Sequence, residues 1–187
     1  MESEISVTLE GLAMPEPPPS KYTERDMLDL LAARYTQRSQ GTNDRWMRAE
    51  HVRNGVGFYG YSEITGKCND YLRIADFIAV DTFESKGLDV HGHEVKVSRS
   101  DWLHELADKT KADAWKRYCN RFWLVVPDAA IVRPGELPDG WGLMTIRGGK
   151  LHATHRAPAL TPLPLPKPIW ISLMRSASKT ALNVTTR

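Results

Sequence analysis

The stretch LDVHGHEVKVSRSDW at residues 88–102 changes its pattern halfway along. Up to Ser98, apolar valines alternate with polar residues, which is the period-two pattern of a strand with two different faces. From Ser100 the residues favour a helix, with Ser98 or Ser100 as N-cap and Asp101 in the first turn, where the helix dipole favours an acid. The stretch therefore predicts a strand that leads directly into a helix.

Four further elements are expected around this stretch. The segment TERDMLDLLAARYTQRS carries apolar residues at helical spacing, and Thr23 with Asp26 suits its N-cap. Strands are expected at 46–52, 71–80 and 121–127. The order helix, strand, strand, strand, helix, strand predicts an α/β sandwich with a central mixed sheet flanked by helices.

The chain divides into three parts by composition. Residues 1–20 end in PEPPPS and predict a disordered N-terminal tail. Residues 21–158 carry the expected helices and strands and form the predicted domain, with a turn-and-strand appendage at their end. Residues 159–187 hold the Pro-rich spacer TPLPLPKP and then IWISLMRSASK, for which a short basic amphipathic helix is expected.

Composition and charge exclude several classes of protein. Of the 187 residues, 41% are hydrophobic and 26% charged, and 25 basic against 23 acidic residues leave a net charge of +2. This balance excludes a histone-like nucleic-acid binder but permits a local basic groove. The apolar runs are too short to span a membrane, the N-terminus has no secretory signal, and two cysteines make no disulfide framework. We therefore expect a cytoplasmic protein without a membrane partner.

Two motif matches point to chemistry only weakly, and a third motif is missing. Gly55, Gly57 and Gly60 match a nucleotide-binding fingerprint, but no helix is expected to open from them, so a loop is favoured. His91 and His93 share a strand face and lack a third ligand at a persuasive spacing, which favours partly buried histidines over a metal pair. No G-x-S-x-G elbow supports a hydrolase triad.

An acid-x-Lys triplet inside the strand of residues 88–98 is more informative. Chance alone should produce such a triplet about once in this chain, and it occurs twice, at 84–86 and 94–96. The first lies in a connection. In the second, period two places Glu94 and Lys96 on one face. Asp76 lies 18 residues upstream in the preceding strand, so Asp76 and Glu94 could meet, although spacing alone fits a salt-bridged surface strand equally well.

Two carboxylates and a lysine at one point suit a divalent cation. Mg²⁺ prefers carboxylate, carbonyl and water oxygens, and it can activate a water for attack on phosphorus. Lys96 could orient that water or neutralise charge in the transition state. The helical block after residue 100, with a break expected near Asp108, adds basic and aromatic residues that suit phosphate and base contacts. Its expected core face consists of Leu103, Leu106, Ala107, Thr110, Ala114 and Tyr118.

RIADFIAV, HEVKVSRSDW and the pattern K-x-D-x-W-K-x-Y-C-N-R-F-W together resemble the PD-(D/E)xK nuclease superfamily, over roughly residues 46–145. The nearest subgroup is that of MmcB-type DNA-repair proteins and related actinobacterial and actinophage proteins. The resemblance implies a restriction-endonuclease-like αβββαβ core, the order expected above. It also implies Asp76 and Glu94 as metal ligands, the Val95 carbonyl as a further ligand and Lys96 as the catalytic lysine.

Two departures from the family pattern concern the acids. Ala75 precedes Asp76, so the Pro-Asp dipeptide is missing. Many members carry a glutamate on the first helix; Glu24 and the rival Glu50, on the first expected strand, are the candidates, and neither is preferred.

The expected function is a Mg²⁺- or Mn²⁺-dependent DNA nuclease in repair or recombination. The phosphate-contacting residues expected for it are Arg99, Lys109, Lys111 and Lys116. An alternative is a catalytically inactive DNA-binding or protein-docking module on the same fold, and a third is a purely structural protein. The form of the DNA, endo- or exonucleolytic cleavage, a homodimer and a protein partner at the C-terminal segment are all left open.

Overall fold

The computed structural model describes residues 21–39, 43–108 and 110–185. The tail expected at 1–20 and Lys109 lie outside these residues.

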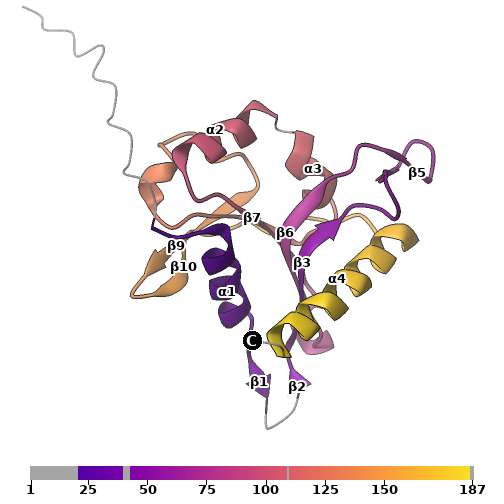
Figure 1. The fold of residues 1–187 in the computed structure, drawn as a ribbon, viewed down its shortest axis with the longest axis horizontal. Coiled ribbons are helices and arrows are strands. Elements are labelled where there is room, and N and C mark those ends of the chain that lie inside the picture. Colours follow the sequence, from indigo (N-terminus) through magenta and orange to yellow (C-terminus); the bar gives the residue numbers. More distant parts are fainter. Residues whose placement is uncertain (1–20, 40–42, 109, 186–187) are drawn as a thin grey trace, which may run out of the picture.

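A six-stranded mixed sheet forms the centre of the protein (Figure 1). The strands in spatial order are β10 (Lys150–His155), β9 (Trp141–Arg147), β8 (Arg121–Val125), β7 (Val90–Val95), β6 (Ile74–Asp81) and β3 (Trp46–Arg53). Strands β3, β6 and β7 pair antiparallel, β8 pairs parallel with both β7 and β9, and β10 returns antiparallel to β9. The α/β prediction with a mixed sheet is confirmed.

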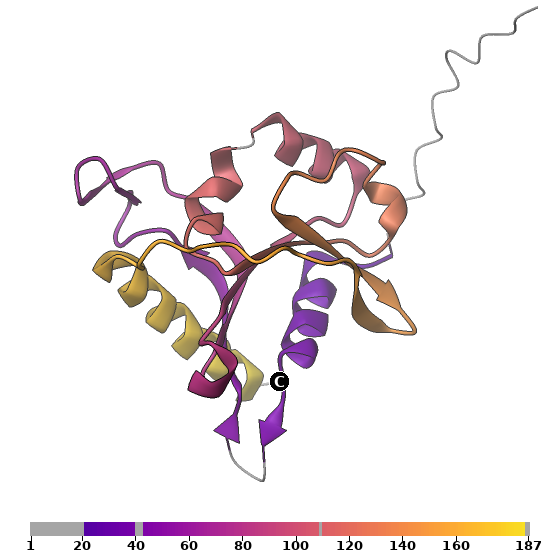
Figure 2. The same ribbon diagram turned by 180° about the vertical axis from the view of Figure 1, so that it is seen from behind.

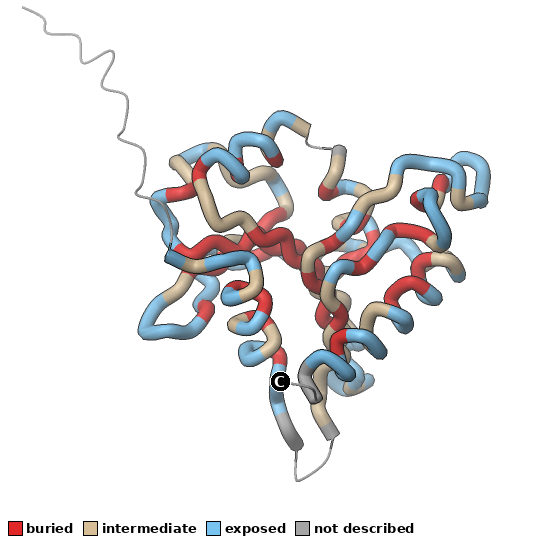
Figure 3. Tube along the Cα trace, in the orientation of Figure 1, coloured by how far each residue is buried: buried red, intermediate tan, exposed pale blue. Residues whose placement is uncertain are grey.

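In the described part of the chain, four helices cover the two faces of the sheet. Helix α1 (Glu24–Arg34) packs on one face, where Leu28 and Leu31 join Phe77 and Trp123 in a buried cluster. On the other face lie α2 (Arg99–Ala107), α3 (Thr110–Lys116) and α4 (Lys167–Thr185). Figure 2 shows the same arrangement from behind. In Figure 3 the buried residues concentrate along the central strands, between the helices.

The ends of the first two helices follow from local sequence. The Thr23 hydroxyl accepts from the Asp26 N–H while the Asp26 carboxylate accepts from the Thr23 N–H, a capping box as expected. Ser98 caps α2 by accepting from the Asp101 N–H. Helix α2 ends at Ala107, so the break expected near Asp108 is confirmed.

The remaining elements are short. They are the strand pair β1 (Arg38–Ser39) and β2 (Asn43–Asp44), the hairpin β4 (Gly60–Ser62) and β5 (Lys67–Asp70), and two 3-10 turns at Glu84–Lys86 and Ala129–Ile131. Gly55 and Gly57 of the fingerprint match lie in a loop, as expected, and Gly60 begins β4. At Gly55 and Gly60 backbone atoms approach too closely for any side chain.

Helix α4 differs from its expectation in length. It spans 19 residues rather than a short segment, and it packs along β3. Ile169 and Leu173 are fully buried in the main core, and the Thr180 hydroxyl accepts from the Glu50 N–H at 2.9 Å. Tertiary packing therefore extends the helix beyond its apolar stretch. None of the helices within the described residues is long and apolar enough to cross a membrane.

Two histidines of β7 are held by one tyrosine. Nδ1 of His93 lies 3.2 Å from the Phe77 carbonyl, so it donates there and Nε2 accepts from the Tyr35 hydroxyl at 2.9 Å. That hydroxyl oxygen in turn accepts from Nδ1 of His91 at 3.0 Å. Burial lowers the pKa of His91 to about 4, and the charge of Arg121 adds to this effect. Both rings are thus neutral hydrogen-bonded core groups.

We expect the free energy of unfolding to fall as the pH drops from about 6.5 towards 4. In that range the unfolded chain binds a proton on His91 and the folded chain does not, so acid favours unfolding. His91→Gln keeps a donor for Tyr35 and should remove part of this loss, on the order of 3 kcal/mol at most. Urea denaturation at several pH values measures it, with the exposed His152→Gln as control. An unchanged pH dependence in His91→Gln would contradict the assignment.

Candidate metal centre

The two acids expected in neighbouring strands do meet. In the β6–β7 pair Phe77 lies opposite His93, and the next step along both strands reaches Asp76 and Glu94. The Asp76 carboxylate also accepts a hydrogen bond of 2.7 Å from the Val95 N–H, which fixes its position. The paired register ends at Phe77 and His93, so Asp76 and Glu94 are the next residue of each strand, just beyond the pairing.

Lys96 lies between two buried glutamates. Its ammonium donates to Glu94 Oε1 at 2.6 Å and lies 3.3 Å from Oε2 of Glu105 on α2. Both glutamates are under a tenth exposed. The positive charge of Lys96 therefore offsets part of the cost of burying the two glutamates away from water.

Burial changes the proton affinity of these acids. The pKa of Glu94 is raised to about 8 by desolvation and by the charges of Asp76 and Glu105, against the lowering effect of Lys96. Desolvation also raises the pKa of Asp76, while Lys96 and the Val95 N–H lower it. Three carboxylates thus share one ammonium, and the surplus negative charge favours either a proton or an added cation.

A second group of ligand atoms adjoins Asp76. One ligand atom each from Glu24, His51 and Asp76 lies within 4.8 Å of the other two. Glu24 is the first residue of α1, and its carboxylate is 3.9 Å from Nδ1 of His51. His51 has a left-handed backbone (φ 50°) inside β3, a strained conformation for a residue with a side chain.

Of the two candidate glutamates, only Glu24 reaches this group. The Glu50 carboxylate is held by Arg25 through two hydrogen bonds of 2.6 and 2.8 Å. Glu24, Asp76 and Glu94 offer oxygen ligands, which suit Mg²⁺ and Mn²⁺, and the imidazole of His51 adds a nitrogen ligand that Mn²⁺ accepts more readily than Mg²⁺ does. The residues present therefore fit a divalent cation.

A cavity of about 330 Å³ opens beside the centre. Its lining includes Glu24, Val95, Lys96, Glu105 and Lys111. Lys111 is thus the expected phosphate-contacting residue that lies close to the candidate centre.

The other expected phosphate contacts are placed differently. Arg99 is 7% exposed, forms an ion pair with Glu136 and donates to the Ile131 carbonyl at 2.8 Å. The Arg99 guanidinium is thus enclosed and paired within the fold, which does not favour the expected contact with DNA. The Lys116 ammonium donates to the Asp139 carbonyl at 2.9 Å and lines cavities that lack Lys96. Lys109 lies outside the described residues.

Comparison with known proteins gives a likeness in fold. No protein-family model matches the chain, and no curated protein matches it significantly. Among solved structures it is similar to SPO1766, a protein of unknown function from Silicibacter pomeroyi. The TM-score is 0.52, with 18% identity over 90% of each chain. A likeness at this identity supports the mixed α/β fold and carries no information on activity.

Glu94→Gln should separate stability from metal binding. The change replaces a desolvated carboxyl by a neutral amide and leaves Lys96 its contact with Glu105, so we expect the metal-free variant to melt at or above the parent's temperature. Added Mn²⁺ should raise the melting temperature of the parent and leave that of the variant unchanged. Glu84→Gln, in the exposed triplet at 84–86, is the control and should respond like the parent. Equal metal-induced shifts in parent and Glu94→Gln would exclude Glu94 as a ligand.

Proposed function

We propose that the protein is a metal-dependent nuclease that hydrolyses DNA phosphodiesters, in DNA repair or recombination, with Mg²⁺ or Mn²⁺ as cofactor. The observation that carries the proposal is the meeting of Asp76, Glu94 and Lys96 at the end of the β6–β7 pair. Each of these buried carboxylates makes the ionised form of the other less favourable, and a cation between them would relieve that repulsion. The resemblance of the same residues to the PD-(D/E)xK motif supports the proposal independently.

Each residue has a distinct role in this reaction. Asp76 and Glu94 hold the cation, with the Val95 carbonyl and Glu24 as further ligands. When bound, the cation supplies an activated water and neutralises charge on the phosphoryl oxygens. Lys96 orients the attacking water and stabilises the negative charge that grows at phosphorus.

Glu105 is a positioning residue in this scheme. A cation at Glu94 would compete with the Lys96 ammonium for the same carboxylate. Glu105, 3.3 Å from that ammonium, would then hold Lys96 in place after its bond to Glu94 weakened.

Cleavage of labelled single-stranded, duplex and branched DNA with Mg²⁺ or Mn²⁺ tests the proposal. Lys96→Ala should lower the rate about 100-fold or more, the size of effect seen when a transition-state charge loses its partner. Lys86→Ala is the matched control, because Lys86 belongs to the other acid-x-Lys triplet and is exposed. Its rate should equal the parent's.

A second variant distinguishes loss of catalysis from loss of folding. Lys96→Ala leaves buried acids uncompensated, whereas Asp76→Asn keeps the Lys96 ion pairs and should also abolish cleavage. If the folded parent cleaves none of the substrates with either metal, the proposal fails. The alternative, an inactive DNA-binding or docking module on the same fold, then takes its place.

A further inference from the structure

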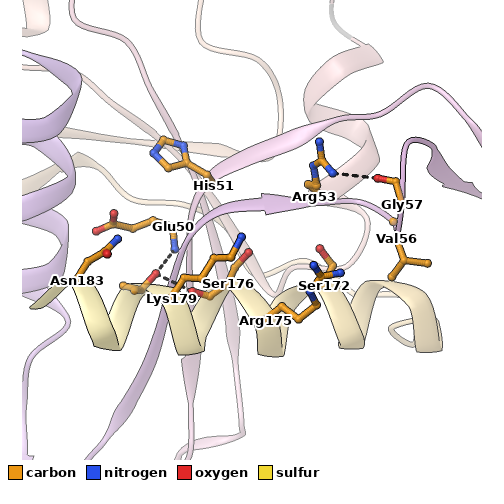
Figure 4. A pocket seen from close by; sticks show the side chains of 12 residues that line it. Glu50, His51, Arg53, Val56, Gly57, Ser172, Arg175, Ser176, Lys179 and Asn183 are labelled. Atoms are coloured by element: carbon orange, nitrogen blue, oxygen red, sulfur yellow. Dashed lines mark hydrogen bonds between the residues drawn. The ribbon is translucent and has the colours of Figure 1, made fainter. Parts of the chain in front are cut away.

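A second cavity of about 330 Å³ lies between β3 and α4 (Figure 4). We call it the basic cleft; it is lined by Glu50, His51, Arg53, Gly55, Val56, Gly57, Ser172, Arg175, Ser176, Lys179, Thr180 and Asn183. Figure 4 shows Lys179 and Ser176 extending from α4 towards the strand, and Arg53 projecting from β3. The cleft thus combines three cations with hydroxyl groups.

The charge of the basic cleft is not compensated locally. Glu50 is the acid in its lining, and Arg25 already holds that carboxylate through two hydrogen bonds. Within the described residues, Arg175 and Lys179 are exposed and form no ion pair with a carboxylate. One turn of helix separates them, about 6 Å along the axis. Cations repeated at such a spacing suit successive phosphates of one strand.

The basic cleft shares one residue with the candidate metal centre. His51 lines the cleft and also belongs to the group formed with Glu24 and Asp76. A phosphate chain with one phosphodiester at Asp76 would therefore enter the cleft beside His51. From there it would run along α4 past Lys179 and Arg175.

Two exposed aromatic residues directly follow the loop that lines the cleft. Val56 and Gly57 line it, and the next two residues, Phe58 and Tyr59, are 89% and 60% exposed. Arg53 donates to the Gly57 carbonyl at 2.9 Å, which ties this loop to β3. Proteins bind unpaired bases by stacking them on aromatic side chains that lie beside cations. In a duplex the bases are stacked on one another inside the double helix and cannot make this contact.

We propose that the basic cleft binds single-stranded nucleic acid and leads it to the candidate metal centre. Arg53, Arg175 and Lys179 contact the phosphates, and Phe58 and Tyr59 stack on bases. The claim that the cleft leads the nucleic acid to the candidate metal centre rests on the proposed nuclease function. The claim that the cleft binds single-stranded nucleic acid does not depend on that function.

Fluorescence anisotropy with a labelled oligo-dT of about 20 nucleotides and a duplex of equal length tests the proposal. EDTA is present, so cleavage cannot interfere. The parent should bind the single strand at least about tenfold more tightly than the duplex. The double variant Arg175→Glu/Lys179→Glu should bind about tenfold more weakly or worse, with a salt dependence reduced by about 1.4 in log–log slope, from about 0.7 per lost phosphate contact.

Two further variants complete the test. Phe58→Ala/Tyr59→Ala should weaken single-strand binding about tenfold while leaving the salt slope unchanged, because stacking is not ionic. Lys150→Glu/Arg156→Glu, exposed cations at β10, is the matched charge-reversal control and should bind like the parent. Thermal melting of each variant verifies its fold.

The possible results distinguish the proposal for the basic cleft from the proposal for the nuclease. Single-strand binding that needs Arg175 and Lys179 and survives Asp76→Asn, with no cleavage by the parent, supports the cleft and overturns the nuclease. If the parent cleaves DNA with metal, and the cleft variant and the control variant weaken single-strand binding equally, the cleft proposal fails and the nuclease proposal stands. Duplex bound as tightly as single strand also overturns the cleft proposal.

Discussion

The pairing of β6 with β7 is the constraint around which the rest of the structure is arranged. It brings Asp76 and Glu94 close together in a buried position. Two negative charges that are buried side by side must be compensated by a proton or a positive charge. One ammonium, that of Lys96, lies against Glu94 and is shared with Glu105 of α2. The N-terminus of α1 adds Glu24 beside Asp76, which increases the negative charge. Such a cluster lowers the stability of the metal-free protein, and a bound cation would offset that cost.

The strands, the first helix and the meeting of the two acids could be predicted from the sequence. Period-two alternation identifies β7, and the separation of 18 positions from Asp76 to Glu94 suits two adjacent strands with a short connection. The capping box at Thr23 is a local signal, so the start of α1 was also predictable. These features depend on neighbours in sequence, and for that reason they can be recognised without a structure.

The residues that were missed depend on contacts distant in sequence. Helix α2 was expected to bury Leu103, which is 43% exposed, whereas Trp102 and Glu105 face the core. A short helix with few apolar residues has a weak periodic signal, so its orientation is decided by the sheet beneath it. Arg99 looked like a phosphate ligand because its partner, Glu136, lies 37 residues away. His51 carries no signal in the sequence, since its role arises from the register of β3 with β6.

Anomalous diffraction from crystals of the parent soaked in Mn²⁺ tests the central claim most directly. The account predicts a peak at about 2.1 Å from carboxylate oxygens of both Asp76 and Glu94, with the Lys96 ammonium displaced towards Glu105. The peak should be missing in Asp76→Asn crystals treated in the same way. Fully soaked parent crystals with no peak at this pair, or with manganese bound only elsewhere, would contradict the claim that these acids form a cation site.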